Sequence, residues 1–320
     1  MPRIVRPTAY GTPDVLAVVE APTPPAPVDG VVVEVRAAGV NPIDWKLYSG
    51  DFHTVDDDHK DAAGLAGSMP SIGLECAGVV AEIGAEVTGV RIGDEVIVYP
   101  VTGAYADYVA APAASILAKP AGLGWAEAGS LMLTGTTAIH ALHAAGVTAG
   151  DTVLIHGGSG GVGLMGVQLA AVAGATVVAT GAERNHELLR ELGATPVVYG
   201  PGLADRVCAA APQGVSAAVD FAGTDEALDV SLELVADRAR IASITGSPRR
   251  AAAGIKLIGY GPGQDAGTEI RRAARGELID RAESGTLRVI VDSTFSLDQV
   301  AKAHEVGIAG HAAGKLVLIP

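Results

Sequence analysis

The feature that most constrains this chain is the glycine-rich segment 152–163, which reads TVLIHGGSGGVG. An apolar run typical of a buried strand leads into Gly158, Gly160 and Gly163, and the helix-forming sequence LMGVQLAAVAG follows directly. Between a strand and a helix, this spacing permits a tight turn, a close approach of backbone to a pyrophosphate, and close packing of the helix on the strand. Free N–H groups at the start of the helix then face the phosphates. The segment therefore predicts a dinucleotide-binding site.

The composition fits two domains with aliphatic cores. The chain has 320 residues, which corresponds to two domains at ~150 residues each. It is 49% hydrophobic but only 4% aromatic, so its cores must be built mainly from Val, Ala, Leu and Ile. This composition suits sheets covered by alanine-rich helices.

The charge and the cysteine content argue against several classes of protein. A net charge of -14 disfavours nucleic acids and anionic membrane surfaces, because both need concentrated Lys and Arg. Two cysteines are too few for a disulfide framework or a zinc cluster. The first residues lack the apolar region of a signal peptide, and every long apolar stretch is interrupted by glycine or charge. We therefore expect a soluble cytoplasmic protein with no nucleic-acid and no membrane partner.

Residues 1–122 carry the pattern of β structure. Val-rich runs such as 31–40 and 77–87 are separated by turn residues, and the proline-rich stretch 21–27 cannot join a ladder. This pattern predicts a compact antiparallel barrel. The polar segment 51–70 is interpreted as a solvated acidic loop that flanks the expected site and is a candidate lid.

From residue 123 the pattern changes to alternating helices and strands. Repeated βα units with apolar strands predict a parallel, doubly wound sheet. After residue 285 the sequence is strand-like again, and its final strand, in GKLVLIP, either extends that sheet or returns to the first domain. The elements expected in this region are helices at 125–142, 164–173 and 183–192 and strands at 152–156, 176–179, 196–199, 217–221 and 241–245.

The tip of the second of these strands bears on the choice between NAD and NADP. In NAD binders a carboxylate at this tip hydrogen-bonds the adenosine ribose. Here the strand ends in Thr180 and Gly181, without a carboxylate. Gly181 leaves room for a 2′-phosphate, and Arg184 can pair with that phosphate through its planar fork. Glu183 lies near the expected position of an acid, but the balance favours NADPH over NADH.

Motifs along nearly the whole chain carry a family resemblance. In order they are NPID, GLECAG, GAYADYV, LTGTTAIHAL, HGGSGGVG, RELGA and GKLVL. Together they resemble the medium-chain dehydrogenase/reductase superfamily, in particular its zinc-free quinone oxidoreductase (zeta-crystallin-like) branch. The resemblance implies an α/β protein with a GroES-like β-barrel catalytic domain, residues 1–122 and 287–320, and a Rossmann domain, residues 123–286. It also implies that the final strand returns to the first domain and that the protein is a homodimer.

The motifs depart from those of the zinc-dependent members at the metal ligands. Asn41 stands where those members have a cysteine ligand, and Leu74 stands where they have the histidine of Gly-His-Glu. Catalytic zinc needs three protein ligands, and these two changes remove two of them. The four-cysteine structural loop is absent as well, because no cysteine lies between positions 77 and 207. We therefore expect no metal.

The resemblance also implies roles for single residues. Asn41 is expected beside the nicotinamide, Thr134 at its carboxamide, and Lys315 near the pyrophosphate, with Asp44 and Glu75 close by. Residues 159–162 are expected at the pyrophosphate and residues 221–222 at the nicotinamide ribose. The full set of expected cofactor contacts is Asn41, Thr134, Gly158, Ser159, Gly160, Gly161, Val162, Thr180, Gly181, Arg184, Phe221, Ala222, Ile244, Gly246 and Lys315.

Without a metal, the hydride acceptor must already be electrophilic. Zinc is not expected to polarise a simple carbonyl here, so the acceptor is predicted to be a quinone, an enone or an enoyl thioester. The sequence predicts an NADPH-dependent reductase of quinones or enones, with Asn41 and Tyr48 as candidate catalytic residues. Tyr48 is the candidate proton donor, and bound water is the alternative. Two other functions stay open: an enoyl-thioester reductase of a biosynthetic pathway, and a catalytically weak NADPH-binding sensor or structural protein.

Overall fold

The computed structural model describes residues 1–50 and 69–320 and divides the chain into two compact units. Unit 1 comprises Met1–Leu133 and Val291–Pro320, and unit 2 comprises Thr134–Ile290. From the sequence, these boundaries are expected after residues 122 and 286. The candidate lid at 51–70 lies, except for its last two residues, outside the described part of the chain.

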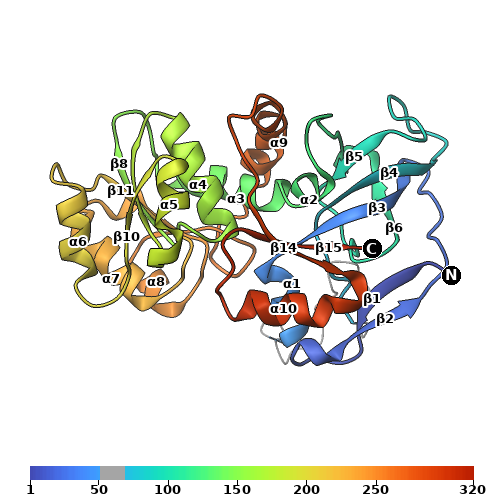
Figure 1. Ribbon diagram of the computed structural model, residues 1–320, viewed down its shortest axis with the longest axis horizontal. Helices are drawn as coiled ribbons and strands as arrows, with labels where there is room; N and C mark the ends of the chain where they lie inside the picture. Colours follow the sequence, from blue (N-terminus) through green and yellow to red (C-terminus); the bar gives the residue numbers. More distant parts are fainter. Residues whose placement is uncertain (51–68) are drawn as a thin grey trace. The chain divides into compact units, whose positions relative to one another are not determined.

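Unit 1 is built on a seven-stranded sheet with the order β14-β15-β3-β4-β5-β7, in which β6 also pairs with β3. The last strand, β15 (Lys315–Ile319), pairs antiparallel with β3 (Gly30–Val40) and parallel with β14 (Val291–Ser296), as Figure 1 shows. The final strand therefore returns to the N-terminal sheet. The other strands of unit 1 are β4 (Cys76–Ile83), β5 (Glu95–Val98), β6 (Tyr108–Pro112), β7 (Ile116–Ala118) and the separate pair β1 (Arg3–Pro7) and β2 (Leu16–Glu20).

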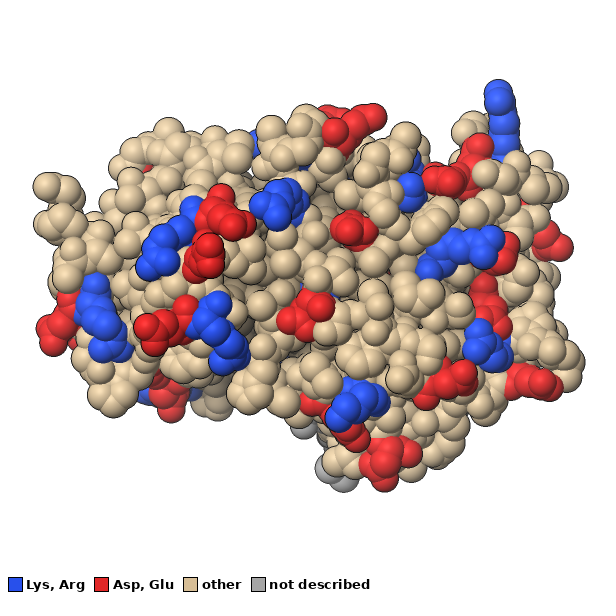
Figure 2. All heavy atoms as spheres, in the orientation of Figure 1, with Lys and Arg blue, Asp and Glu red and all other residues tan. Residues whose placement is uncertain are grey.

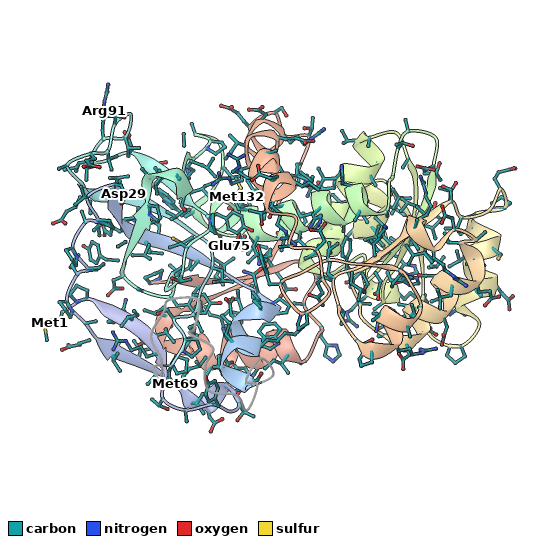
Figure 3. All side chains as sticks on the ribbon, turned by 180° about the vertical axis from the view of Figure 1, so that it is seen from behind. Met1, Asp29, Met69, Glu75, Arg91 and Met132 are labelled. Atoms are coloured by element: carbon teal, nitrogen blue, oxygen red, sulfur yellow. The ribbon has the colours of Figure 1, made fainter. Side chains whose placement is uncertain are left out.

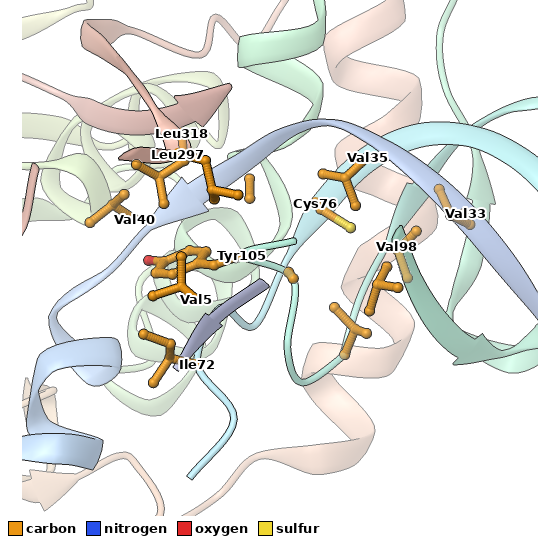
Figure 4. Close-up of a cluster of buried hydrophobic side chains, with 14 of the residues drawn as sticks. Val5, Val33, Val35, Val40, Ile72, Cys76, Val98, Tyr105, Leu297 and Leu318 are labelled. Carbon is orange, nitrogen blue, oxygen red and sulfur yellow. The ribbon is translucent and has the colours of Figure 1, made fainter. Parts of the chain in front are cut away.

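Aliphatic side chains form most of the core of unit 1, as the low aromatic content predicts. The buried ring of Tyr105 lies among them, with Leu297 and Leu318 on one side and Val5 and Ile72 on the other (Figure 4). The helices of this unit are α1 (Pro42–Ser49), α2 (Trp125–Ala128) and α10 (Val300–Ile308), with short 3-10 helices η1 (Pro13–Val15), η2 (Ala113–Ser115) and η5 (Leu297–Gln299).

Two expectations from the sequence are wrong in this region. The single helix expected at 125–142 is broken, because α2 ends at Ala128 and α3 (Met132–Ala144) begins after a turn. At that turn a Cβ on Gly129 would lie 2.5 Å from the carbonyl oxygen of Ala37 in β3, so only glycine, a weak helix former, fits at this position. The segment after residue 285 is only partly strand-like, since α10 lies between β14 and β15.

Unit 2 is a six-stranded sheet with the order β10-β9-β8-β11-β12-β13, and all of its neighbouring strands run parallel. This order confirms the predicted doubly wound sheet. From β8 the chain adds β9 and β10 on one side, and then β11, β12 and β13 on the other (Figure 1). Ligands of such sheets bind at the carboxyl ends of the strands where the order reverses. Those strands are β8 and β11.

The elements of unit 2 follow the predicted alternation. The strands are β8 (Thr152–His156), β9 (Thr176–Thr180), β10 (Ala194–Val197), β11 (Ala217–Asp220), β12 (Ile241–Ser243) and β13 (Lys256–Leu257). The helices are α4 (Gly161–Val172), α5 (His186–Glu191), α6 (Leu203–Ala210), α7 (Asp225–Leu234), α8 (Pro248–Ala252) and α9 (Thr268–Glu283), with 3-10 helices η3 (Glu183–Asn185) and η4 (Arg238–Arg240).

The charges of the chain are distributed rather than segregated on the face shown in Figure 2, where acidic and basic side chains alternate. The whole chain is acidic because it has 36 Asp and Glu against 22 Lys and Arg. Within residues 1–50 and 69–320, no helix is both long and apolar enough to cross a membrane.

Candidate active site

The glycine loop of unit 2 has the geometry that the motif predicts. After β8 the backbone turns at Gly157, whose φ is +71°, and the N–H of Gly158 donates to the carbonyl oxygen of Thr180 at 2.8 Å. A Cβ at Gly163 would lie 2.1 Å from the carbonyl oxygen of Gly157, so this glycine is required for the helix to pack on the turn. A Cβ at Gly160 would meet only that same oxygen, at 3.5 Å, which is an ordinary contact. The middle glycine therefore keeps its outer side open for a ligand.

Helix α4 begins beside this open side. Gly160 is its N-cap residue in an extended conformation, and no side chain of the described residues caps the helix start. The first N–H groups of a helix have no partner within the helix, and together with the helix dipole they favour an anion. Gly161 and Val162, in the first turn, are half-buried. The start of α4 can therefore hold a phosphate group.

The tip of β9 supports the loop and borders the expected adenosine end. Thr180 is buried and holds the turn twice, because its Oγ1 also accepts a hydrogen bond from the N–H of Gly157 at 3.0 Å. A Cβ at Gly181 would lie 2.9 Å from Leu189 and 3.6 Å from the hydroxyl of Ser159. Arg184 is exposed in η3, beyond this tip. The structure thus brings Ser159, Thr180 and Gly181 together.

The ends of β11 and β12 form the other side of the sheet edge. The N–H of Phe221 donates to the carbonyl oxygen of His156 at 3.1 Å, and the N–H of Ile244 donates to that of Asp220 at 3.2 Å. The Phe221 ring packs on α4, where a Cβ at Gly166 would lie 2.7 Å from it. Ala222 is exposed next to this ring. Phe221, Ala222 and Ile244 therefore lie at the edge where the order of the sheet reverses.

Gln264 is a residue of this edge that sequence reasoning missed. Its side chain packs against two glycines. A Cβ on Gly246 would lie 2.0 Å from Gln264 Nε2, and a Cβ on Gly259 would lie 2.3 Å from Gln264 Oε1. Its Oε1 also accepts a hydrogen bond from the N–H of Gly261 at 3.0 Å. The density of glycines in GYGPGQ was the available signal. Gly246, an expected cofactor contact, thus also accommodates Gln264.

In unit 1, Asn41 lies in a fully buried polar cluster with Glu75 and Lys315. Its Nδ2 donates to Glu75 Oε1 at 3.0 Å and to the carbonyl oxygen of Gly39 at 3.1 Å, while its Oδ1 accepts from Lys315 Nζ. Because a carboxylate can only accept and an ammonium can only donate, these partners define which end of the Asn41 amide is oxygen. The orientation of the amide is therefore set from both ends.

Lys315 uses its donors inside this cluster. Besides Asn41, its ammonium donates to the carbonyl oxygen of Val40 at 2.8 Å and to Glu75 Oε1 at 3.3 Å, and its side chain is 3% exposed. Glu75 in turn accepts from the N–H of Leu133 at 2.9 Å, next to the start of α3 (Figure 3). An ammonium has three donors, and three acceptors surround this one. The structure therefore ties Lys315 to Asn41, whereas the resemblance implies a position near the pyrophosphate.

Asp44 is a second buried carboxyl group in unit 1. Its Oδ2 accepts from the hydroxyl of Tyr105 at 2.6 Å and from the N–H of Asn41 at 2.8 Å. Burial raises the pKa of Asp44 to about 6, although these hydrogen bonds and the charge of Lys315 oppose the rise. Burial also lowers the pKa of Lys315, against the attraction of Glu75 and Asp44. The Asp44 carboxyl is therefore a group that takes up a proton as the pH falls through about 6.

The pH dependence of stability is expected to report this group. The folded chain holds the Asp44 proton up to a pH of about 6, while the unfolded chain releases it near its ordinary value of 3.8, so acidification from pH 7 to pH 4 favours the folded state. We expect the wild type to gain about 2 kcal/mol over Asp44→Asn across this interval. Urea unfolding of both proteins at a series of pH values measures the difference, and a constant difference would contradict the assignment.

Tyr48, the candidate proton donor, lies in the interior of unit 1. Its hydroxyl is 2.7 Å from Nδ1 of the buried His304, whose ring stacks on that of Tyr48 and meets Trp45 and Tyr105 edge-on. Burial raises the pKa of Tyr48 and lowers the pKa of His304 to about 4. The structure thus pairs Tyr48 with a neutral imidazole.

Thr134, the remaining expected contact, is buried and is the third residue of α3.

The residues at the expected metal position do not fit a catalytic zinc ion. Asn41 turns its only side-chain oxygen to Lys315, and the side chain of Leu74 offers no atom that can bind a metal. The oxygens of Asn41, Glu75 and Val40 instead surround an ammonium, which would repel a dication. Across residues 1–50 and 69–320, no three His, Cys, Asp or Glu side chains are grouped to hold a metal ion.

Comparison with known proteins identifies two family models along the chain. A model described as alcohol dehydrogenase GroES-like domain matches residues 28–121. A model described as zinc-binding dehydrogenase matches residues 192–318. Among curated proteins, the chain is 29% identical to 2-methylene-furan-3-one reductase of Solanum lycopersicum, over 98% of this chain and 78% of that protein.

Solved structures of similar proteins align with all or nearly all of this chain. The quinone oxidoreductase of Coxiella burnetii is 30% identical with a TM-score of 0.83, covering 100% of this chain and 99% of that one. The quinone oxidoreductase of Escherichia coli complexed with NADPH is 27% identical with a TM-score of 0.82, covering 100% of both chains. The CurK enoyl reductase is 25% identical with a TM-score of 0.84, covering 99% of both chains.

Proposed function

Because this chain belongs to the medium-chain dehydrogenase/reductase superfamily, as a quinone oxidoreductase-like member, we propose that it is a zinc-independent, NADPH-dependent reductase of quinones or α,β-unsaturated carbonyls. The observation that carries the proposal is the ammonium of Lys315, held by Glu75 and by Asn41, the residue that stands where the zinc-dependent members have a cysteine ligand. With no Lewis acid to polarise a carbonyl, the acceptor must bring its own electrophilicity.

Two observations support NADPH as the cofactor. The tip of β9 carries Gly181 without a carboxylate, and Arg184 is exposed just beyond it, where its guanidinium can meet a 2′-phosphate. The Escherichia coli quinone oxidoreductase that this chain resembles was solved with NADPH. Glu183, exposed beside Arg184, is an acid near the position where NAD binders carry one, so NADH stays the less favoured alternative.

The residues of the chain divide the work of binding and orientation. When bound, the nicotinamide ring supplies a hydride from its C4 atom. Gly160 and the start of α4 would hold the pyrophosphate, Phe221 and Ala222 would border the nicotinamide ribose, and Thr134 would meet the carboxamide. Asn41 is proposed to stand beside the ring with its amide orientation set by Lys315 and Glu75. Such fixed groups lower the barrier by holding the acceptor against the ring.

The proton that follows the hydride is proposed to come from water, with Tyr48 as the alternative donor. The Tyr48 hydroxyl already pairs with His304, and burial raises its pKa. Tyr48→Phe is therefore expected to change kcat less than about threefold, whereas loss of a required acid costs about a hundredfold or more. The same variant is expected to lose about 1–3 kcal/mol of stability, because it leaves Nδ1 of buried His304 without a partner. Steady-state kinetics and urea unfolding measure the two effects, with exposed Tyr199→Phe as the control.

An acceptor panel tests the proposed function. Purified protein treated with a chelator is mixed with NADPH and, in turn, a quinone, a simple enone and an enoyl thioester, and the loss of nicotinamide absorbance is followed. Turnover of the quinone or the enone, unchanged by the chelator, is the expected result. Preference for the thioester would establish the alternative that the likeness to CurK enoyl reductase favours. Tight NADPH binding without turnover of any acceptor would mark a sensor or structural protein.

Two further properties are proposed from the family alone. The protein is expected to be a homodimer and to work in the cytoplasm on a small-molecule acceptor. Light scattering of the purified chain measures the first property, with a mass near 32.1 kDa contradicting it.

A further inference from the structure

A buried carboxylate connects the loops at the ends of β11 and β12. Asp220, the last residue of β11, is 2% exposed, and its Oδ1 accepts from the N–H groups of Ala222 at 2.9 Å and Gly223 at 2.8 Å. Its Oδ2 accepts from the hydroxyl of Ser243, the last residue of β12, at 3.1 Å. Thr245 packs on the same turn, since a Cβ at Gly223 would lie 2.7 Å from its hydroxyl oxygen. One side chain therefore holds both loops.

Arg250 of α8 completes this arrangement. It is 3% exposed, and its Nε and Nη2 both donate to Asp220 Oδ2, at 3.2 and 3.0 Å. Nη2 also donates to the carbonyl oxygen of Thr224 at 2.7 Å. The guanidinium thus joins the carboxylate to the far end of the turn, while Ser247 holds the N–H of Arg250 at the start of α8. Three segments that are separate in sequence meet at one ion pair.

We propose that Arg250 is a positioning residue for the nicotinamide half of the cofactor, which it serves by fixing the turn 221–224 through Asp220. The inference rests on the proposed function, because that turn carries the expected contacts Phe221 and Ala222. The expected contacts of the adenosine half, at the tip of β9, share no hydrogen bond with Arg250 in the described part of the chain. The two halves of the cofactor should therefore respond differently to a change at Arg250.

Position 250 requires the planar guanidinium group of arginine. Three donations to two acceptors at opposite ends of one turn need two nitrogen atoms held in one plane. Lysine keeps the charge, but its single nitrogen cannot reproduce the spread, so Arg250→Lys loosens the turn without leaving Asp220 unpaired. Arg249 supplies a matched control, because it is adjacent, lies on the surface of α8, and pairs with the exposed Asp225 and Asp229.

The experiment compares two ligands on Arg250→Lys and Arg249→Lys. NADPH probes the whole site, and adenosine 2′,5′-bisphosphate probes the adenosine half alone. We expect Arg250→Lys to raise the Kd of NADPH by about tenfold and to lower kcat by a similar factor, because the nicotinamide is misplaced. The Kd of the bisphosphate is expected to stay unchanged. Hydrogen exchange at the amides of Ala222 and Gly223 is expected to become faster. Arg249→Lys is expected to change none of these quantities.

Each other result counts against the inference. Equal losses for NADPH and the bisphosphate would show a general loss of structure, and unchanged NADPH binding in a folded Arg250→Lys protein would show no positioning role. If Arg250→Lys does not fold, Ser243→Ala removes one hydrogen bond of Asp220 and is expected to weaken NADPH alone, by about threefold. An unchanged ratio of the two Kd values there overturns the inference. A wild type that binds neither ligand overturns the proposed function, which separates the two failures.

Discussion

Lys315→Met is expected to destabilise the protein by about 3–5 kcal/mol, which is the usual cost of removing one partner from a buried ion pair. Glu75 would be left buried, at 1% exposure, without its ammonium partner, and the Oδ1 of Asn41 would lose its donor. Methionine is similar to lysine in length and shape, so little of the loss would come from packing. Urea unfolding followed by circular dichroism measures the change.

Two further variants separate charge from packing in this experiment. Lys315→Met combined with Glu75→Gln removes both charges and is expected to recover part of the loss, because no unpaired charge remains buried. Lys302→Met breaks the exposed pair with Glu305, where the two side chains are 63% and 57% exposed, and is expected to leave stability unchanged. A loss below about 1 kcal/mol in Lys315→Met would contradict a buried ion pair at this position.

Local patterns explain why the nucleotide side of the molecule was predictable. The glycine loop, the strands of unit 2 and the bare tip of β9 are each encoded within one or two dozen neighbouring residues, where turn chemistry and periodicity act directly. The helix expected at 125–142 shows the limit of such patterns. The contact that requires glycine at position 129 is with Ala37 in β3, which is distant in sequence, and no local pattern records that contact.

Contacts between distant segments explain what the sequence did not reveal. Lys315 meets Asn41 across 274 positions, and Arg250 meets Asp220 across 30. A buried arginine or lysine is rare without a partner. The resemblance placed Lys315 near the pyrophosphate, and no sequence pattern singled out Arg250. Glu75 and Asp44 were expected near Lys315 only through the resemblance. The hydrogen-bonding partners that set the orientation of Asn41 became visible only in the fold.

Replacing two glycines of the loop by alanine, one at a time, is expected to have different effects on stability and on cofactor binding. Gly163→Ala puts a Cβ 2.1 Å from the carbonyl oxygen of Gly157, a backbone atom that cannot move without the turn. This variant is expected to lose about 3 kcal/mol of stability through overpacking, and cofactor binding with it. Gly160→Ala meets that oxygen at 3.5 Å, so it is expected to fold with nearly unchanged stability.

Gly160→Ala is expected to affect cofactor binding, because its methyl group would lie on the side of the loop that faces the ligand. Its new methyl group would occupy the space through which backbone approaches the pyrophosphate, so the Kd of NADPH is expected to rise by about tenfold or more. Fluorescence titration with NADPH, beside urea unfolding of both variants, distinguishes the two effects. Unchanged NADPH binding in Gly160→Ala would place the pyrophosphate elsewhere. Because Gly160 and Gly163 lie within one turn of each other, opposite outcomes at the two positions would separate the glycine that the fold requires from the one that the cofactor requires.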